Sequence, residues 1–175
     1  MSEQTPQVST ALNIAILTVS DSRTEANDIS GKVLVERLQR AGHKLADKQI
    51  CIDSLYAIRA VVSQWINDEN IHAVITTGGT GLTGRDITPQ AMTVLYDKAI
   101  EGFGEVFRML SYNIIGSSTV QSRAVAGIAN GTVLFSLPGS PGACKDGWDG
   151  IIQEQLNIDH QPCNLVQIMP RFLEK

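Results

Sequence analysis

The sequence has little cysteine and little histidine. Its three cysteines, Cys51, Cys144 and Cys163, lie far apart, and none belongs to a C-x-x-C motif. The three histidines are equally dispersed and have no metal-ligand spacing. These absences argue against a disulfide framework and against a zinc site. We interpret the cysteines as small core hydrophobes or incidental surface thiols.

Long apolar runs, basic clusters and a signal-peptide pattern are also lacking. No apolar run approaches the length of a membrane span. Lys and Arg occur singly, and a net charge of −4 is unfavourable for binding nucleic acid. Residues 2–10 are polar and lack the charged-then-apolar layout of a signal peptide. We therefore expect a cytoplasmic protein that binds neither nucleic acid nor membrane.

The composition that is present fits one globular domain. A chain of 175 residues can bury a substantial core, and a hydrophobic content of 43% with 18% charged residues is unlike a disordered chain. We expect a flexible lead-in over residues 1–11, a folded domain over 12–156 and an irregular tail over 157–175.

Strand and helix patterns alternate along the domain. Near-continuous apolar runs predict buried strands, and apolar residues at helical spacing predict helices. The predicted strands are residues 13–19, 43–52, 71–76 and 132–137. The predicted helices begin at the capping residues Ser30, Ser54, Thr88 and Ser140, with one more helix after an interruption at 102–105. This alternation indicates an α/β fold with a largely parallel sheet.

The most informative segment is Thr76-Thr77-Gly78-Gly79-Thr80-Gly81, which follows the third predicted strand. Its glycines allow the backbone to turn sharply or a ligand to approach closely. Arg85-Asp86-Ile87-Thr88-Pro89 then places a carboxylate beside a helix start, with Thr88 as the predicted N-cap and Pro89 as the first helical residue. The combination indicates an anion site suited to a phosphate-bearing ligand and an adjacent metal ion.

Residues 79–84 also match the G-x-G-x-x-G string of dinucleotide-binding folds, so a nicotinamide-dependent oxidoreductase is a remote alternative. In those folds the helix opens within the glycine string. Here a polar loop, residues 83–88, separates the string from the predicted helix start. A P-loop is not indicated, because no Lys-Ser or Lys-Thr pair follows the glycines.

Polar segments follow four predicted strands, at residues 20–23, 53–54, 77–86 and 138–140. The carboxyl ends of parallel strands meet at one edge of a sheet, where ligands gather. We therefore expect Asp21, Asp53 and Asp86 to surround the glycine segment.

The glycine segment and the Arg-Asp-Ile-Thr-Pro motif together resemble the signature of the molybdopterin-binding MoaB/Mog family. Four more segments resemble that family: Thr18-Val19-Ser20-Asp21, Gly102-Phe103-Gly104-Glu105, Gln121-Ser122-Arg123 and Leu137-Pro138-Gly139. The resemblance spans residues 13–156, and Tyr56-Ala57-Ile58-Arg59-Ala60 is similar to the MoaB branch. It implies a three-layer α/β sandwich and a role in molybdenum cofactor biosynthesis.

The resemblance implies molybdopterin as the ligand. Proteins of the Mog branch join AMP to molybdopterin, a reaction that uses ATP and a hard cation such as Mg²⁺. The segment Arg85–Pro89 is close to the Mog pattern and favours that activity here. A non-catalytic molybdopterin-binding or carrier protein of the same pathway is the alternative.

The candidate site residues come from these motifs. Asp86 and Asp53 are the candidate catalytic and metal-binding carboxylates. The candidate contacts to pterin or phosphate are Ser20, Asp21, Thr77, Gly78, Gly79, Thr80, Gly81, Glu105, Ser122, Arg123, Pro138, Gly139 and Ser140. Turn formation and helix capping are competing roles for the acidic residues and for Ser140.

The segment 103–110 is more apolar than a one-sided helix requires. Its apolar residues are Phe103, Val106, Phe107, Met109 and Leu110. This surplus predicts a subunit interface, although a helix buried on all sides within one subunit is the alternative. The family resemblance implies a homotrimer or, in the MoaB branch, a hexamer, and it allows contacts with other proteins of the pathway.

Overall fold

The computed structural model describes residues 10–175 and contains a six-stranded sheet in the order β2-β1-β3-β6-β5-β4. Most of the expected lead-in, residues 1–11, lies outside the described residues. The parallel strands are β1 (Asn13–Val19), β2 (Lys44–Cys51), β3 (Ala73–Thr77) and β6 (Thr132–Leu137). Strands β4 (Lys98–Ala99) and β5 (Val125–Ala129) continue the sheet in antiparallel pairing.

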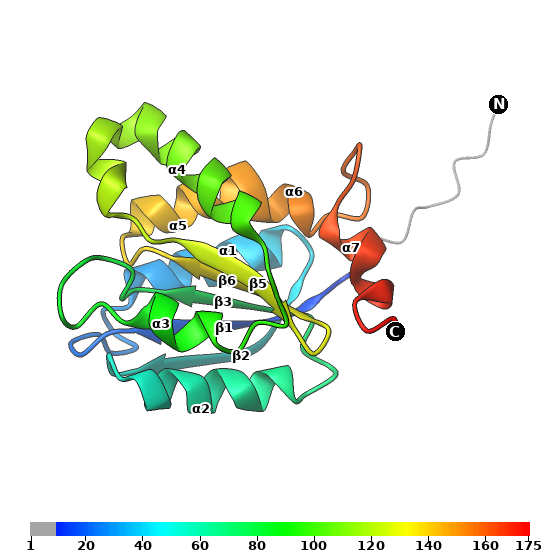
Figure 1. Ribbon diagram of the computed structural model, residues 1–175, viewed down its shortest axis with the longest axis horizontal. Coiled ribbons are helices and arrows are strands. Elements are labelled where there is room, and N and C mark those ends of the chain that lie inside the picture. The colour runs from blue at the N-terminus through cyan, green and yellow to red at the C-terminus, as the bar shows by residue number, and fades with distance from the viewer. Residues whose placement is uncertain (1–9) are drawn as a thin grey trace.

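Helices cover both faces of the sheet (Figure 1). One face carries α1 (Ile29–Arg40), α4 (Glu101–Ile115), α5 (Pro141–Gly147) and α6 (Gln153–Gln155), the last two joined by a π-helical segment, Trp148–Ile152. The other face carries α2 (Leu55–Ile66) and α3 (Thr88–Thr93). This arrangement confirms the predicted three-layer α/β fold with a mostly parallel sheet.

The alternation of side chains along β1 divides the core in two. Ile14 and Ile16 belong to the cluster under α1, α4 and α5, whereas Ala15 and Leu17 belong to the cluster under α2 and α3. Successive side chains of a strand point to opposite faces, so a strand between two helical layers needs apolar residues at every position. This requirement explains why the run at 13–19 reads as continuously hydrophobic.

The antiparallel edge of the sheet was not predicted. Strands β5 and β6 are joined by Asn130 and Gly131, whose φ angles are 47° and 85°. Positive φ at both central residues is typical of the tight turn that joins twisted antiparallel strands, and Asn-Gly is its strongest sequence signal. That dipeptide was the available evidence for a hairpin at this position.

Two predicted helix caps are wrong. Asp28, rather than Ser30, caps α1 by accepting a hydrogen bond from Gly31 N, while Ser30 Oγ donates to Gly139 O. Ile87 occupies the N-cap position of α3, because the hydroxyl of Thr88 instead donates to Gly78 O at 2.8 Å. Both hydroxyls therefore connect a helix start to the residues that follow a strand, over 109 positions for Ser30 and 10 for Thr88.

Three further helix predictions need correction. The segment 102–105 does not interrupt the chain, because α4 begins at Glu101, and Gly104 permits close packing of the helix against Ala124 O. The helix after Pro89, expected from the sequence to carry Met92, Leu95 and Tyr96, is short, because α3 ends at Thr93. The tail at 157–175 is not irregular throughout, since Asn164 caps helix α7 (Leu165–Ile168), which buries Val166.

The apolar segment in α4 is only partly exposed. Phe103 and Phe107 are 4% and 1% exposed and pack in the core cluster that contains Phe135. The prediction that these two phenylalanines form an exposed surface is therefore wrong. Val106 and Met109 lie on the outer side of the same helix, with exposed fractions of 39% and 60%.

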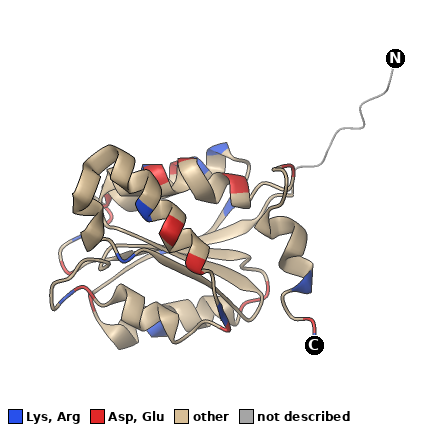
Figure 2. Ribbon diagram, turned by 45° about the horizontal axis from the view of Figure 1, so that its top comes forward, with Lys and Arg blue, Asp and Glu red and all other residues tan. Residues whose placement is uncertain are grey.

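Charged residues are distributed over all layers of the molecule (Figure 2). Lys and Arg positions are scattered singly in this view, in agreement with the sequence. Within residues 10–175, no helix combines the length and the apolar character needed to cross a membrane.

We expect a pH-dependent stability from His43. Burial lowers the pKa of this histidine, and its unprotonated Nδ1 accepts a hydrogen bond from Leu12 N at 3.2 Å. Because the folded state favours the neutral ring, this stabilisation is complete above the unfolded-state pKa of about 6.5 and is lost as the pH falls below it. Urea unfolding between pH 7 and pH 5 should show a decline of at most about 1.4 kcal/mol per pH unit from this group.

The variant His43→Asn keeps an acceptor but cannot titrate, so its unfolding free energy should depend less on pH. His160→Asn, at a partly exposed position, is the control. Equal pH dependence in the wild-type protein and His43→Asn would contradict this assignment.

Candidate functional site

The loops that follow β1, β2, β3 and β6 gather at one edge of the sheet, on the left of Figure 1. They enclose a cavity of about 300 Å³, here called the acidic cavity. It is lined by Thr18, Val19, Ser20, Ser22, Arg23, Asp28, Ser30, Asp53, Thr77, Gly78, Gly79, Arg85, Asp86 and Gly139. The predicted convergence of the polar segments on one rim is confirmed.

The turn after β3 requires glycine. Gly78 and Gly79 have φ angles of 104° and 66°, a region that side chains with a Cβ rarely adopt. A Cβ at Gly78 would collide with Val19 O, and a Cβ on Gly139 would lie 3.2 Å from the Gly78 Cα. The backbones at the ends of β1, β3 and β6 are therefore in direct contact.

Hydrogen bonds hold this glycine loop, residues 78–81, against its neighbours. Gly78 N donates to Leu137 O at 3.0 Å, and Thr77 Oγ1 donates to Pro138 O at 2.9 Å. The predicted ligand contact Arg123 uses Nε and Nη2 to bind Gly81 O and Asp86 O, at 2.8 and 2.6 Å. Arg123 thus braces the loop through its carbonyl groups, and a direct contact with ligand stays a prediction.

The glycine string does not form a dinucleotide-binding turn. Helix α3 begins at Thr88, after the loop of residues 82–87, so no helix opens within the string 79–84. This geometry agrees with the interpretation that the string match is coincidental.

The two candidate catalytic carboxylates both line the acidic cavity but differ in their surroundings. Burial, and then the charge of Asp21, raises the pKa of Asp53. Hydrogen bonds from the Thr83 hydroxyl and backbone N–H, at 2.7 and 2.8 Å, lower the pKa of Asp86. A Cβ at Gly79 would lie 3.1 Å from Asp53 Oδ1, so Asp53 reaches the glycine loop.

Asp21 is engaged by an arginine from the opposite loop. Arg85 Nε donates to Asp21 Oδ2 at 2.9 Å, and Arg85 Nη2 donates to Asp21 Oδ1 at 2.7 Å. The hydrogen bond from Arg85 lowers the pKa of Asp21. Asp21 Oδ1 also accepts a hydrogen bond from Asp53 N at 3.1 Å. One ion pair thereby connects the loops that follow β1, β2 and β3.

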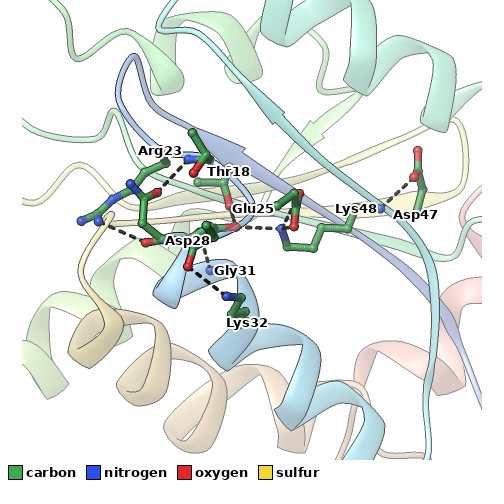
Figure 3. A network of polar contacts seen from close by, with 11 residues as sticks. Thr18, Arg23, Glu25, Asp28, Gly31, Lys32, Asp47 and Lys48 are labelled. Carbon is green, nitrogen blue, oxygen red and sulfur yellow. Dashed lines mark hydrogen bonds and ion pairs between the residues drawn. The ribbon is translucent and has the colours of Figure 1, made fainter.

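Asp28 was not predicted to be part of this region. Its carboxylate is 1% exposed and lies between the Lys48 ammonium, 2.9 Å away, and the Thr18 hydroxyl (Figure 3). Burial opposes its ionisation, but the hydrogen bonds from Lys48, Gly31 N and Thr18 hold its pKa below the ordinary value. The sequence did contain one signal for this role, because Asp28 is a residue type that commonly caps a helix and lies just before the start of α1.

A second cavity of about 370 Å³, here called the apolar cavity, lies on the other side of the glycine loop. It is lined by Gly79, Thr80, Gly81, Asp86, Phe107, Ser111, Ile115, Ser118, Gln121, Ser122, Pro138, Gly139, Ser140 and Ala143. Gly79, Asp86 and Gly139 line both cavities. Within residues 10–175, the buried Ser122 hydroxyl has no hydrogen-bond partner, which is unfavourable unless a ligand supplies one.

Of the residues predicted to contact pterin or phosphate, one lies outside both cavities and two use their hydroxyls in local hydrogen bonds. Glu105 lines a separate cavity with Tyr96 and Arg108 and borders neither cavity at the glycine loop. The Ser140 hydroxyl caps α5 by accepting from Ala143 N at 3.1 Å. Ser20 Oγ accepts from Ser22 N and Arg23 N and closes the turn after β1.

The described residues contain no group of three or more His, Cys, Asp and Glu side chains that could hold a metal ion by themselves. Asp53 and Asp86 nevertheless face one cavity, and Mg²⁺ is commonly held by one or two carboxylates together with phosphate oxygens and water. The two residues fit a cation that arrives with a phosphate ligand.

Comparison with known proteins agrees with this geometry. A family model described as probable molybdopterin binding domain matches residues 15–158. Over 161 residues the chain is 53% identical to molybdenum cofactor biosynthesis protein B of Escherichia coli (strain K12), a match covering 90% of this chain and 95% of that protein.

Solved structures give the same result. A crystal structure of molybdenum cofactor biosynthesis protein B aligns with a TM-score of 0.84 and 40% identity, covering 96% of this chain and 98% of that one. The tungsten cofactor synthesizing protein MoaB from Pyrococcus furiosus aligns with a TM-score of 0.75 and 37% identity, covering 83% and 92%.

We expect Gly79→Ala to damage the site and to destabilise the fold. The new Cβ would collide with Thr88 Oγ1 and would hold an alanine at φ 66°, a conformation that costs roughly 1–2 kcal/mol. Urea unfolding should show this loss, and calorimetry should show weakened binding of a phosphate-bearing ligand. Gly84→Ala is the matched control, because a Cβ there meets no atom within 4 Å. Equal behaviour of the two variants would contradict a conformational role for Gly79.

Proposed function

The chain belongs to the family of probable molybdopterin binding domains, and from this premise we propose that it binds molybdopterin in molybdenum cofactor biosynthesis and adenylylates it with Mg-ATP. Membership confirms the resemblance that the glycine segment and the Arg-Asp-Ile-Thr-Pro motif indicate. A cytoplasmic setting and contacts with other proteins of the pathway are part of the same proposal.

One observation carries this proposal: two chemically different cavities meet at the glycine loop and share Asp86. Phe107 and Ile115 give the apolar cavity surfaces for a flat heterocycle, and the unpartnered Ser122 hydroxyl offers that ligand a polar contact. The acidic cavity combines the glycine loop with charged groups, as a phosphate chain and a cation require. A pterin with a terminal phosphate would therefore meet a nucleotide at the shared residues.

The reaction requires positioning more than covalent chemistry. An oxygen of the pterin phosphate attacks the α-phosphorus of ATP, a new P–O bond forms, and the bond to pyrophosphate breaks. The rigid turn at Gly78 and Gly79 sets how closely a phosphate can approach the backbone. Mg²⁺, when bound, supplies positive charge to the reacting phosphates, and Asp53 and Asp86 are the residues that would hold it.

We expect Asp86→Asn to abolish adenylyl transfer while molybdopterin affinity stays within about tenfold of wild type. The variant keeps the acceptor for Thr83 but removes the negative charge at the junction of the cavities. The experiment incubates the protein with molybdopterin and Mg-ATP and measures pyrophosphate and adenylated pterin.

Ser122→Ala is the complementary variant, because its hydroxyl lines only the apolar side of the site, and it should weaken molybdopterin binding. Unchanged turnover in Asp86→Asn would refute the metal-holding role. Molybdopterin binding by the wild-type protein without any pyrophosphate release would assign it the carrier function instead.

We further propose that the chain forms a homotrimer or hexamer through the outer side of α4. Met109 and Tyr112 are each 60% exposed and lie three residues apart on this helix, so they present one apolar strip. In sedimentation experiments, Met109→Glu should dissociate an assembly of three or six chains, because an unpaired charge would be buried at the contact. Val94→Glu, an exposed position beside α3, is the control. A wild-type monomer with full ligand binding would refute the assembly.

A further inference from the structure

Arg85 lines the acidic cavity but forms an ion pair with a residue outside it. It lines the cavity, yet its Nε and Nη2 atoms are directed to Asp21, which is not part of the cavity wall. The side chains of Arg85 and Asp21 are 64% and 45% exposed. An ion pair so accessible to water contributes little to stability, so a ligand can replace one of its members.

The guanidinium of Arg85 suits phosphate as well as carboxylate. Its parallel N–H groups bind two oxygens at once, and both kinds of oxyanion present such a pair. Arg23 lines the same cavity, and its Nη1 donates to Asn27 O at 3.2 Å. Two arginines facing one cavity of about 300 Å³ favour a ligand with more than one phosphate group.

Asp21 connects the position of Arg85 to the candidate metal residue Asp53. Asp21 accepts from Asp53 N, and its charge contributes, after burial, to the raised pKa of Asp53. While Arg85 is paired with Asp21, the negative charge beside Asp53 is partly neutralised. When Arg85 turns to a phosphate, that charge is uncovered, and the surroundings of Asp53 become more favourable for a cation.

We propose that Arg85 binds the polyphosphate of the nucleotide and that Asp21 competes with the nucleotide for Arg85. The ion pair holds the arginine in the unliganded site, and an incoming phosphate displaces the Asp21 carboxylate. This inference rests on the proposed function for the identity of the nucleotide, but its test requires neither molybdopterin nor turnover.

The test is a double-mutant cycle in which calorimetry measures the binding of two probes, Mg-ATP and Mg-pyrophosphate. Asp21→Asn should tighten binding by about fivefold, as expected if this exposed pair leaves Arg85 free about a fifth of the time in the wild-type protein. Arg85→Gln should weaken binding by about tenfold. The double variant should match Arg85→Gln within about twofold, because Asp21 acts through Arg85.

The exposed pair of Arg171 and Glu174 supplies matched controls. Its hydrogen bonds have nearly the same form, at 2.8 and 3.0 Å, and neither residue lines the acidic cavity. Glu174→Gln and Arg171→Gln repeat the two charge changes and should leave binding of both probes unchanged. Thermal unfolding of all variants reports that they are folded.

Three results would overturn the inference. Weaker binding in Asp21→Asn would show that Asp21 holds the cation rather than the arginine. If the double variant binds the probes more tightly than Arg85→Gln does, the loss of charge at Asp21 acts on the ligand generally and not through Arg85. Binding of inorganic phosphate that responds to the variants while Mg-pyrophosphate does not would assign Arg85 to a single phosphate group, such as that of the pterin. Failure of adenylyl transfer alone would refute the proposed function and leave this cycle intact.

Discussion

The contact of backbone with backbone around Gly78 is the constraint on which the site depends. Val19 O occupies the space where a side chain of Gly78 would begin, and Gly139 lies against the Gly78 Cα. The ends of β1, β3 and β6 are therefore held closer together than residues with side chains would permit. The loops that continue from these strands must share one edge, where Asp28 and Asp86 line a single cavity together with Asp53 from the loop after β2.

The acidic residues at this edge are stabilised in different ways. Asp28 is buried and paired with Lys48, which secures the start of α1 beside β2 (Figure 3). Asp21 is exposed and paired with Arg85. Within residues 10–175, Asp53 and Asp86 have no ion-pair partner, although Asp86 is held by hydrogen bonds from Thr83. Their unpaired negative charge distinguishes them as the residues suited to a cation.

Arg123 shows how a residue can serve a ligand site without pointing into it. Its backbone N–H binds Thr80 O, and its guanidinium binds the carbonyls of Gly81 and Asp86. These contacts satisfy carbonyl groups at a turn that has no regular secondary structure. Gly81 and Asp86, whose carbonyls Arg123 holds, both line the apolar cavity, so the shape of that cavity depends on this brace.

Local patterns in the sequence determined much of this protein. The apolar runs identified the parallel strands β1, β3 and β6, because a strand covered by helices on both faces must be hydrophobic at nearly every position. The glycine segment indicated the candidate ligand site, because glycine readily adopts the positive φ angles found at Gly78 and Gly79. The rule that parallel strands end at one edge placed Asp21, Asp53 and Asp86 together without any coordinates.

Only the tertiary structure decided which groups those residues contact. Ser30 and Thr88 have the sequence features of helix caps, but Ser30 donates to Gly139 O, far along the chain, and Thr88 donates to Gly78 O at the start of the glycine loop. The sequence predicts that Phe107 belongs to an exposed apolar surface. In the structure it is buried, because Phe103 and the sheet cover it. The pairing of Arg85 with Asp21, and the separation of Glu105 from the site, depend on how loops fold back on one another. Such contacts join residues far apart in the chain, so spacing along the sequence cannot determine them.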